Sequence, residues 1–250
     1  MAENKRGFIC PQWPAPKRVK AFSSTRVGGV SSAPFASLNL GGHVGDSLEA
    51  VTQNRLIFAK QVDMPSSLRW LKQVHGIHTI RLPSSELGDI TADASFSKVK
   101  KQVCAVMTAD CLPLLVCNQQ GTQVAACHAG WRGLCDGVIE SCIEEFSDTS
   151  DLMVWLGPAI GPNAFEVGAE VRQAFIDKDE AAITAFKPSV NAGKWLANIY
   201  QLARQRLTNL GVRQIYGGDC CTYEDDERFF SYRRDKQTGR LASVIWIDEE

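Results

Sequence analysis

The chain has 250 residues, 44% of them hydrophobic, and a formal net charge of −1. This composition allows a large buried core, and the weak net charge argues against nucleic acid or an anionic membrane as the main partner. The sequence begins without the apolar stretch of a secretory signal and has no run of the roughly 18 apolar residues that a membrane helix needs. We therefore expect a cytoplasmic protein that acts on a small molecule.

The nine cysteines are odd in number, irregularly spaced and mostly inside apolar runs. This pattern is typical of reduced, buried thiols and not of a disulfide framework. No C-x-x-C motif is present, so a closed structural zinc site is not expected. The adjacent Cys220 and Cys221 are candidates for a redox or ligand pair, although a strand end with one buried thiol explains them better.

The first 16 residues carry three prolines and are expected to form a surface lead-in to a single domain over 17–250. Residues 19–24 predict a strand, and the glycine-rich stretch 24–32 predicts a turn. Its adjacent glycines allow positive φ and close approach to a ligand, with Arg26 as a cation beside them. On turn statistics alone, an ordinary turn with a solvated arginine is the simpler interpretation.

Residues 46–62 predict a helix, because Asp46 and Glu49 form a start that resembles a capping box and apolar residues recur at helical spacing until Pro65. This helix is expected to be scaffold. His43, which lies beside two glycines just before the helix, is interpreted as a loop residue and not as a ligand.

Strands are expected at 68–74 and 77–82, so His75 falls at a strand end, where α/β enzymes commonly place their chemistry. His78 lies in an alternating segment and is expected to point outwards. Residues 83–97 are expected to form a loop. In that loop, Asp93 either orients a histidine or caps a turn.

Apolar runs at 112–117 and 122–127 are separated by a short turn, and Asp110 and Cys111 precede the first run. Antiparallel pairing of the two runs predicts a hairpin. Such a hairpin brings Cys111 and His128 to the same end, where their side chains can be neighbours.

The stretch Gly130-Trp-Arg-Gly133 predicts the start of a helix that runs to about residue 146. The N–H groups at the start of this helix would suit an anion, and Arg132 would add a fixed cation there.

The rest of the chain predicts a strand at 152–156, helices at 168–176 and 194–210, and a strand at 241–247. The aromatic and basic stretch 229–235 could contact a substrate, but an edge strand explains it equally. Strands and helices mix without strict βαβ alternation, which favours one α/β domain with a mixed sheet.

His75, Cys111 and His128 are a candidate ligand set for Zn²⁺ with the fourth position open, as in catalytic zinc sites. Their spacing matches no established zinc signature. A core thiol with two ordinary polar histidines would explain the same residues. A third interpretation takes Cys111 as a nucleophile and His128 as its base. The residues alone leave these interpretations open.

Eight motifs follow one another from about residue 20 to the C-terminus: Thr25-Arg-Val-Gly-Gly-Val-Ser31, Ser37-Leu-Asn-Leu-Gly41, His43-Val-Gly-Asp46, Lys72-Gln-Val-His-Gly76, Thr108-Ala-Asp-Cys111, His128-Ala-Gly-Trp-Arg-Gly133, Gly157-Pro-Ala-Ile-Gly161 and Phe229-Phe-Ser-Tyr-Arg-Arg-Asp235. Together they resemble the YfiH-like family of the purine nucleoside phosphorylase type. This family is also called the laccase-domain, multicopper polyphenol oxidoreductase or peptidoglycan editing factor PgeF family.

The resemblance implies a single-domain, layered α/β/β/α sandwich with mixed sheets, similar to the catalytic domain of cytotoxic necrotising factor. It also implies that His75, Cys111 and His128 bind the metal. The implied activities are zinc-dependent phosphorolysis of adenosine, inosine or methylthioadenosine to free base and pentose 1-phosphate, and adenosine deamination. Copper-dependent polyphenol oxidation and the editing of peptidoglycan precursors by an amidase or hydrolase are the alternatives.

Multicopper oxidation needs several histidine-rich copper centres, which four histidines in the whole chain cannot supply. We therefore rank nucleoside phosphorolysis first, with zinc as the expected metal and copper as the alternative. Arg26 and Arg132 are predicted to bind phosphate or the transition state, and Asp93 or Asp110 to orient groups or carry a proton. The expected partners are a nucleoside and phosphate, and the chain is expected to be a monomer or homodimer.

Overall fold

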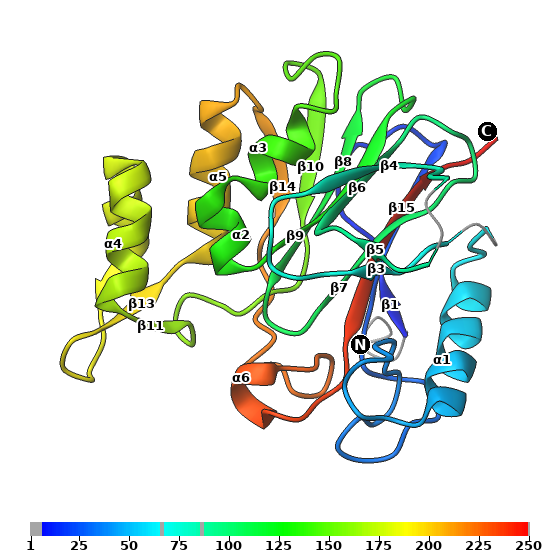
Figure 1. Cartoon of the computed structure of the whole chain (residues 1–250), viewed down its shortest axis with the longest axis horizontal. Coiled ribbons are helices and arrows are strands. Elements are labelled where there is room, and N and C mark those ends of the chain that lie inside the picture. Colours follow the sequence, from blue (N-terminus) through cyan, green and yellow to red (C-terminus); the bar gives the residue numbers. More distant parts are fainter. Residues whose placement is uncertain (1–6, 66–67, 86–87, 250) are drawn as a thin grey trace.

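The chain folds into four layers, in which two central β-sheets lie face to face and helices cover both outer faces (Figure 1). The computed structural model describes residues 7–65, 68–85 and 88–249. The layers arise from strands that bury both of their faces. In β8 (Leu112–Asn118), for example, every residue is buried.

A six-stranded sheet forms one central layer, with parallel pairs at its two edges and antiparallel pairs inside. The strand order is β14 (Gln214–Gly217), β10 (Leu152–Leu156), β8, β9 (Val124–Ala129), β6 (Ala94–Ser97) and β4 (Thr79–Leu82).

A four-stranded sheet forms the other central layer and is antiparallel throughout. Its order is β1 (Phe8–Ile9), β2 (Val19–Ser24), β15 (Leu241–Ile247) and β7 (Cys104–Thr108). Two small sheets lie outside these layers, one of β11 (Glu166–Gly168), β13 (Lys194–Ala197) and β12 (Phe186–Pro188), the other of β3 (Leu71–Lys72) and β5 (Ile90–Thr91).

Alternate side chains of each strand serve different layers, because successive residues of a strand point to opposite faces. In β8, Leu114 packs in the core beneath the helices, whereas Leu115 packs in the core between the sheets. In β15, Ile245 belongs to the core between the sheets, and Trp246 packs with Phe58 on the outer side. The alternation therefore builds three stacked apolar cores.

The helices divide between the two outer faces (Figure 1). The four-stranded sheet is covered by α1 (Leu48–Gln61). The six-stranded sheet is covered by α2 (Trp131–Asp136), α3 (Val138–Ile143) and α5 (Ile199–Asn209), with α4 (Ala169–Lys178) and the 3-10 helix η2 (Glu180–Ala185) farther out. The short α6 (Tyr232–Asp235) follows β14 in the chain.

The layered mixed α/β architecture expected from the sequence is confirmed. The predicted strands at 19–24, 112–117, 122–127, 152–156 and 241–247 and the helix at 168–176 all form, with shifts of a few residues. The scaffold helix also forms, but its cap is Ser47, which accepts a hydrogen bond from the backbone N–H of Ala50, and not the predicted Asp46.

Four predictions of local structure are wrong. The helix expected over 130–146 is two short helices, α2 and α3, because Gly137 between them has a φ of 112°. Residues 194–197 form β13 instead of helix, since they pair with β11 and β12. The loop expected at 83–97 contains β5 and β6, and the stretch 229–235 ends in α6 and is no edge strand.

Two smaller differences concern the N-terminal half. The strand expected at 68–74 is limited to β3, and residues 66–67 just before it lie outside the described part of the chain. Within the expected lead-in, Phe8 and Ile9 pair with β2 as β1.

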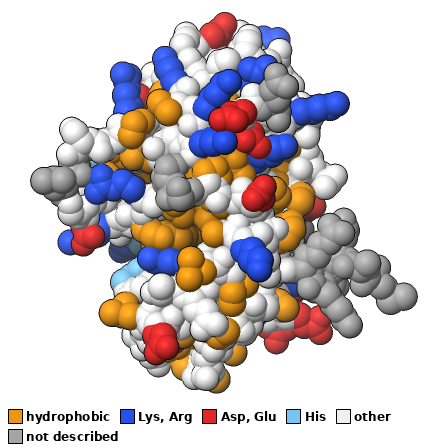
Figure 2. All heavy atoms as spheres, turned by 90° about the vertical axis from the view of Figure 1, so that its right-hand side faces the viewer, with side chains coloured by type: hydrophobic (Ala, Val, Ile, Leu, Met, Phe, Trp, Pro, Cys, Tyr) orange, Lys and Arg blue, Asp and Glu red, His pale blue; other side chains and the backbone are white. Residues whose placement is uncertain are grey.

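Figure 2 shows the face of the molecule that carries α1. Lysine and arginine side chains are interspersed there with acidic and apolar side chains, so the coloured part of this face shows no continuous basic stripe. No helix in the described ranges is long and apolar enough to cross a membrane.

Candidate metal centre

The β8–β9 hairpin brings two of the three candidate ligands together. Leu112 pairs with Ala129 and Pro113 with His128, so Cys111, directly before β8, lies beside the end of β9. The predicted hairpin geometry is thus confirmed. His128 is 3% exposed, whereas Cys111 is partly exposed, so the imidazole is held in the core while the thiol remains accessible.

His75 reaches the same point from the segment between β3 and β4. Its φ of 60° lies in the left-handed region, which residues with a side chain rarely adopt. The backbone N–H groups of Val74, His75 and Gly76 donate to the carboxylate of Asp93 at 3.1, 2.9 and 2.8 Å, respectively. Successive N–H groups that converge in this way form an anion-binding nest. Asp93 therefore stabilises the strained backbone that presents His75.

Asp93 also orients His128. Its Oδ1 lies 2.8 Å from Nδ1 of His128, which leaves Nε2 of that imidazole for a metal. Burial raises the pKa of Asp93, but hydrogen bonds from His128, Gly76 and Val74 outweigh burial and hold the pKa below its ordinary value. One ionised carboxylate thus positions both histidines. Orienting a histidine is one of the two roles that the sequence left open for Asp93.

The three donor atoms are close enough to share one ion. The ligand atoms of His75, Cys111 and His128 all lie within 4.8 Å of one another. Sγ of Cys111 is 3.7 Å from Nε2 of His75. Ordinary Zn–S and Zn–N bonds in tetrahedral geometry separate sulfur from nitrogen by about 3.6 Å, so this sulfur–nitrogen pair has the spacing that Zn²⁺ needs.

Gly130 leaves room for this convergence. A Cβ atom at position 130 would lie 2.6 Å from Cδ2 of His75 and 3.1 Å from Sγ of Cys111. These separations are shorter than ordinary van der Waals contacts, so any larger residue would displace two ligands. Steric crowding by His75 and Cys111 therefore explains why a glycine occupies position 130 in the motif His128-Ala-Gly130.

Charge coupling favours the ionised thiol. Burial opposes ionisation of Cys111, but the positive charge of His128 and hydrogen bonds from His128 and His75 lower its pKa to about 6. Burial also disfavours the charged form of His128, but the charge of Cys111 and the hydrogen bond to Asp93 raise its pKa to about 9. Because the thiolate is the form that binds metal, the site is prepared for a cation, which would replace the proton on His128.

Asp110 fixes the corner that precedes Cys111. Its φ is 87°, again in the left-handed region. Its Oδ1 accepts a hydrogen bond from the hydroxyl of Thr222 and its Oδ2 accepts one from the backbone N–H of Arg233, each at 2.6 Å. The carbonyl of Asp110 accepts from the backbone N–H of Ile160 at 2.9 Å. These contacts join the Cys111 corner to the segments before and within α6.

A cavity of about 160 Å³ opens beside Cys111. The rings of Trp131, Phe165 and Tyr232 form part of its wall. The exposed Arg132 lies at this wall, because its guanidinium stacks on Trp131 with 4.4 Å between Cζ and the ring centroid. An apolar cavity of about 150 Å³ holds a benzene ring in another protein, so this pocket accommodates one planar ring.

The other predicted cation, Arg26, lies in a different environment. Its Nε donates to the carbonyl of Ala36 at 3.0 Å and its Nη1 to the carbonyl of Asp226 at 2.9 Å. The guanidinium lies over the ring of Phe230. Among the described interactions, none joins Arg26 to the three donors.

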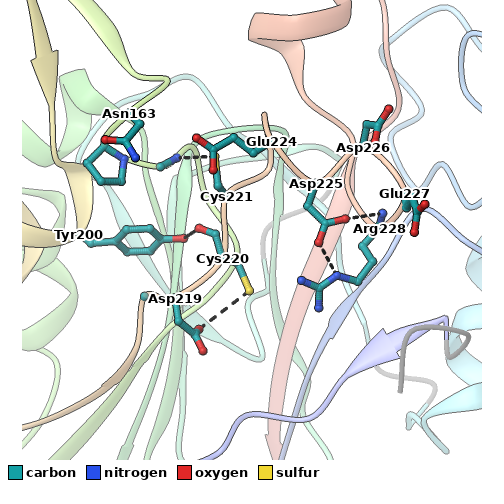
Figure 3. A pocket seen from close by; sticks show the side chains of 13 residues that line it. Asn163, Tyr200, Asp219, Cys220, Cys221, Glu224, Asp225, Asp226, Glu227 and Arg228 are labelled. Atoms are coloured by element: carbon teal, nitrogen blue, oxygen red, sulfur yellow. Dashed lines mark hydrogen bonds and ion pairs between the residues drawn. The ribbon is translucent and has the colours of Figure 1, made fainter. Parts of the chain in front are cut away.

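A larger cavity, of about 660 Å³, contains none of the three ligands (Figure 3). In Figure 3, Asp225 points towards Arg228, with which it forms an ion pair at 2.6 Å, and Asp219 points towards Sγ of Cys220. Cys220 and Cys221 follow the end of β14, but both are only partly buried, so the expectation that one of these thiols is buried is wrong. Five carboxylates line the cavity, which disfavours an anion: Asp219, Glu224, Asp225, Asp226 and Glu227.

Two further arginines, Arg233 and Arg240, lie beside the site. Arg233 lines the pocket next to Cys111, and its Nη1 donates to the carbonyl of Glu166 at 2.7 Å. Burial lowers the pKa of Arg240, whereas the nearby negative charge of Cys111 raises it. Arg233 lies in the stretch 229–235, which the sequence offered as a possible substrate contact, whereas Arg240 was not predicted. Arg240 lies outside every motif, and only the pairing of β15 with β7 brings it to the site.

The fold and the donor set define a layered α/β/β/α protein with a candidate mononuclear metal site. The sequence model of a family described as multi-copper polyphenol oxidoreductase laccase matches residues 20–248. The chain belongs to this family, and the resemblance found in its motifs is confirmed.

Individual relatives match over nearly the whole chain. Purine nucleoside phosphorylase YfiH of Escherichia coli (strain K12) is 57% identical over 241 residues, which cover 96% of this chain and 98% of that protein. A purine nucleoside phosphorylase of Haemophilus influenzae is 52% identical over 242 residues, which cover 96% of this chain and 99% of that protein. The crystal structure of Neisseria meningitidis protein NMB0706 superposes with a TM-score of 0.93 at 48% identity, covering 97% of this chain and 100% of that one.

Proposed function

We propose that the chain is a zinc-dependent purine nucleoside phosphorylase, which converts adenosine, inosine or methylthioadenosine and phosphate to free base and pentose 1-phosphate. The observation that carries this proposal is the donor set of His75, Cys111 and His128 beside an aromatic pocket. Relatives that match nearly the whole chain bear the name purine nucleoside phosphorylase, which supports the same activity.

The donor chemistry supports zinc. Two imidazoles and a thiolate are ordinary zinc ligands, and three protein ligands leave a fourth position for water or substrate. A bound divalent ion would supply Lewis-acid and orienting chemistry. The two remaining histidines, His43 and His78, are outside the donor set, so the chain cannot furnish the several copper centres of a multicopper oxidase.

The pocket beside Cys111 suits one ring of a purine base. A flat heterocycle can stack on the rings of Trp131, Phe165 and Tyr232, which offer apolar surface and ring faces. The apolar wall would also keep water away from the glycosidic bond, so that phosphate and not water is the acceptor.

In phosphorolysis, an oxygen of phosphate forms a bond to the anomeric carbon as the C–N glycosidic bond breaks. The base leaves with the bonding electrons and takes up a proton. Arg26 and Arg132 are proposed to place positive charge near the transition state. Asp93 and Asp110 are assigned positioning roles, because Asp93 holds both histidines and Asp110 holds the Cys111 corner.

An assay with inosine tests the proposal. Purified protein, with zinc quantified by elemental analysis, should release hypoxanthine only when phosphate is present and form an equal amount of ribose 1-phosphate. Cys111→Ala should remain folded by circular dichroism but lose both zinc and activity. Cys10→Ala, which changes an exposed cysteine, is the matched control and should retain both.

The same assay separates the alternatives. Cleavage of an amide or ester in a muramyl-type substrate without phosphate would favour the editing hydrolase. Conversion of adenosine to inosine would add deamination to phosphorolysis. A zinc-loaded protein that turns over none of the nucleosides in the presence of phosphate would contradict the proposal.

A further inference from the structure

Strand pairing brings Arg240 to the edge of the metal site. β15 pairs with β7 so that Leu241 lies opposite Thr108. Arg240 directly precedes β15, and the corner that carries Cys111 directly follows β7. Because the two strands are antiparallel, the start of β15 lies beside the end of β7. Arg240 is therefore at the same end of the sheet as the corner that carries Cys111.

The guanidinium of Arg240 is held on one side only. Its Nη1 donates to the carbonyls of Thr238 and Gly239, each at 3.1 Å. Its Cζ lies 6.0 Å from the ring centroid of Tyr232, which lines the pocket together with Cys111. Nε and Nη2 donate no hydrogen bond to any described residue. Two donor nitrogens therefore remain available beside the pocket.

The guanidinium of Arg240 forms no direct ion pair within the described part of the chain. Burial lowers its pKa, and the nearby groups of Cys111, Asp110 and Tyr232 raise it. The Asp110 carboxylate already accepts two hydrogen bonds. A partly buried cation without a direct ion-pair partner is stabilised when an anion binds to it.

A buried polar network fixes the backbone of Arg240. Oδ1 of Asn39 accepts from the backbone N–H of Arg240 at 2.8 Å, and the carbonyl of Arg240 accepts from the backbone N–H of Leu40 at 3.1 Å. Nδ2 of Asn54 donates to the carbonyl of Asn39 at 2.9 Å. Asn39 and Asn54 are both 0% exposed. The motif that begins at residue 37 thereby positions Arg240, a role that the metal ligands do not explain.

The absence of a side chain at Gly41 allows the Arg240 side chain to adopt its present position. A Cβ atom at position 41 would lie 2.6 Å from Cγ of Arg240. The aliphatic stem of the arginine therefore packs directly on the glycine backbone. A side chain at this position would push the guanidinium away from its present place.

We propose that Arg240 is the phosphate anchor of the phosphorylase, with its free N–H groups donating to a phosphate held between the Cys111 corner, Tyr232 and the loop around Gly41. This inference rests on the proposed function, because it assigns the second substrate of that reaction. Arginine suits the role, since its planar fork donates two parallel hydrogen bonds to phosphate oxygens.

Four other arginines are less suited to this role. Arg26 already uses Nε and Nη1 for two backbone carbonyls, and Arg132 is exposed and stacks on Trp131. Arg228 and Arg234 are each paired with a carboxylate. The larger cavity is lined by five carboxylates and would repel phosphate.

The test combines binding and kinetics on the full-length, zinc-loaded protein. Arg240→Met keeps the aliphatic stem but removes the charge, and Arg240→Lys keeps a charge without the fork. Gly41→Ala displaces the guanidinium, and Arg213→Gln is the control because Arg213 is exposed. Affinity for inorganic phosphate is measured by calorimetry, and the KM values for phosphate and inosine are measured separately.

Arg240→Met should weaken phosphate binding and raise the KM for phosphate by about ten-fold or more, while the KM for inosine stays near that of the unaltered protein. Arg240→Lys and Gly41→Ala should show smaller changes in the same direction, and Arg213→Gln none. If Arg240→Met does not fold by circular dichroism, Arg240→Lys and Gly41→Ala decide the matter.

Phosphate affinity that is unaltered in the folded Arg240 and Gly41 variants would overturn the inference. So would an unaltered protein that binds no phosphate. An unaltered protein that binds phosphate through Arg240 but releases no base from nucleosides would contradict the proposed function and leave the phosphate site standing.

Discussion

Oδ1 of Asp93 lies 2.8 Å from Nδ1 of His128, and this pair is almost entirely removed from solvent. The same carboxylate accepts three backbone N–H groups around His75. Two ligands from separate segments therefore depend on one acidic side chain.

Replacing Asp93 by Asn should weaken metal binding by about 10–100-fold, the usual effect of losing a carboxylate partner of a ligating histidine. The amide has a single acceptor oxygen, and its NH₂ group would face N–H donors. Zinc affinity is measured by competition with a chromophoric chelator. Asp89→Asn, at an exposed carboxylate, should bind zinc normally. Unchanged affinity in Asp93→Asn would refute the positioning role.

Gly130→Ala should reduce zinc affinity and activity together, because the added methyl group would lie 2.6 Å from Cδ2 of His75. The suitable control is Gly42→Ala, where the nearest atom to an added Cβ is 3.8 Å away. Elemental analysis after gel filtration and the inosine assay give the two readouts. A fully metal-loaded, active Gly130→Ala variant would show that the ligands can move apart without loss.

After metal removal by a chelator, Cys111 should be alkylated by iodoacetamide faster than the core thiols. Its pKa is lowered to about 6, whereas burial raises the pKa of Cys104 and of Cys117 to about 12. The thiolate is present above its pKa, so the rate at Cys111 should fall as the pH drops below about 6.

Peptide mass spectrometry locates the label in that experiment, and added zinc should protect Cys111. Cys111→Ser should abolish the rapid phase. Equal labelling of Cys111 with and without zinc would speak against the thiol as a metal ligand.

Asn54→Ala should lower the free energy of unfolding by about 3 kcal/mol, because several buried groups would lose their partners. Nδ2 of Asn54 donates to Ser31, Ser37 and Asn39, and Oδ1 accepts from the backbone N–H of Val30. Urea unfolding followed by circular dichroism measures the change. Thr52→Ala, at an exposed position of the same helix, should change stability little. Similar stabilities for the two variants would contradict this account.

Strands with strong apolar runs could be predicted because local sequence and burial agree, as in the hairpin that joins Cys111 to His128. The helix expected over 130–146 failed because its apolar spacing continues through Gly137, where the backbone turns left-handed. Residues 194–197 also follow helical spacing. Pairing with β11 and β12 makes them a strand, and this contact is invisible to local patterns.

The three donor residues of the candidate site could be predicted, because each has the chemistry of a metal ligand and also lies in a motif. The alternatives for Asp93 could not be decided from sequence, since its nest requires the fold of residues 74–76. Arg240 was missed for a related reason. It is far along the chain from Cys111, and only strand register makes them neighbours.

The three donors are contributed by chain positions separated by 36 and 17 residues. An ion bound to all three would therefore close two long loops of chain at once, and its binding site vanishes when the hairpin and the nest come apart. Such an ion is a reversible cross-link between the β3–β4 segment and the β8–β9 hairpin. Heat resistance of the protein should accordingly track free zinc concentration, which would make metal supply a determinant of how long the folded chain survives.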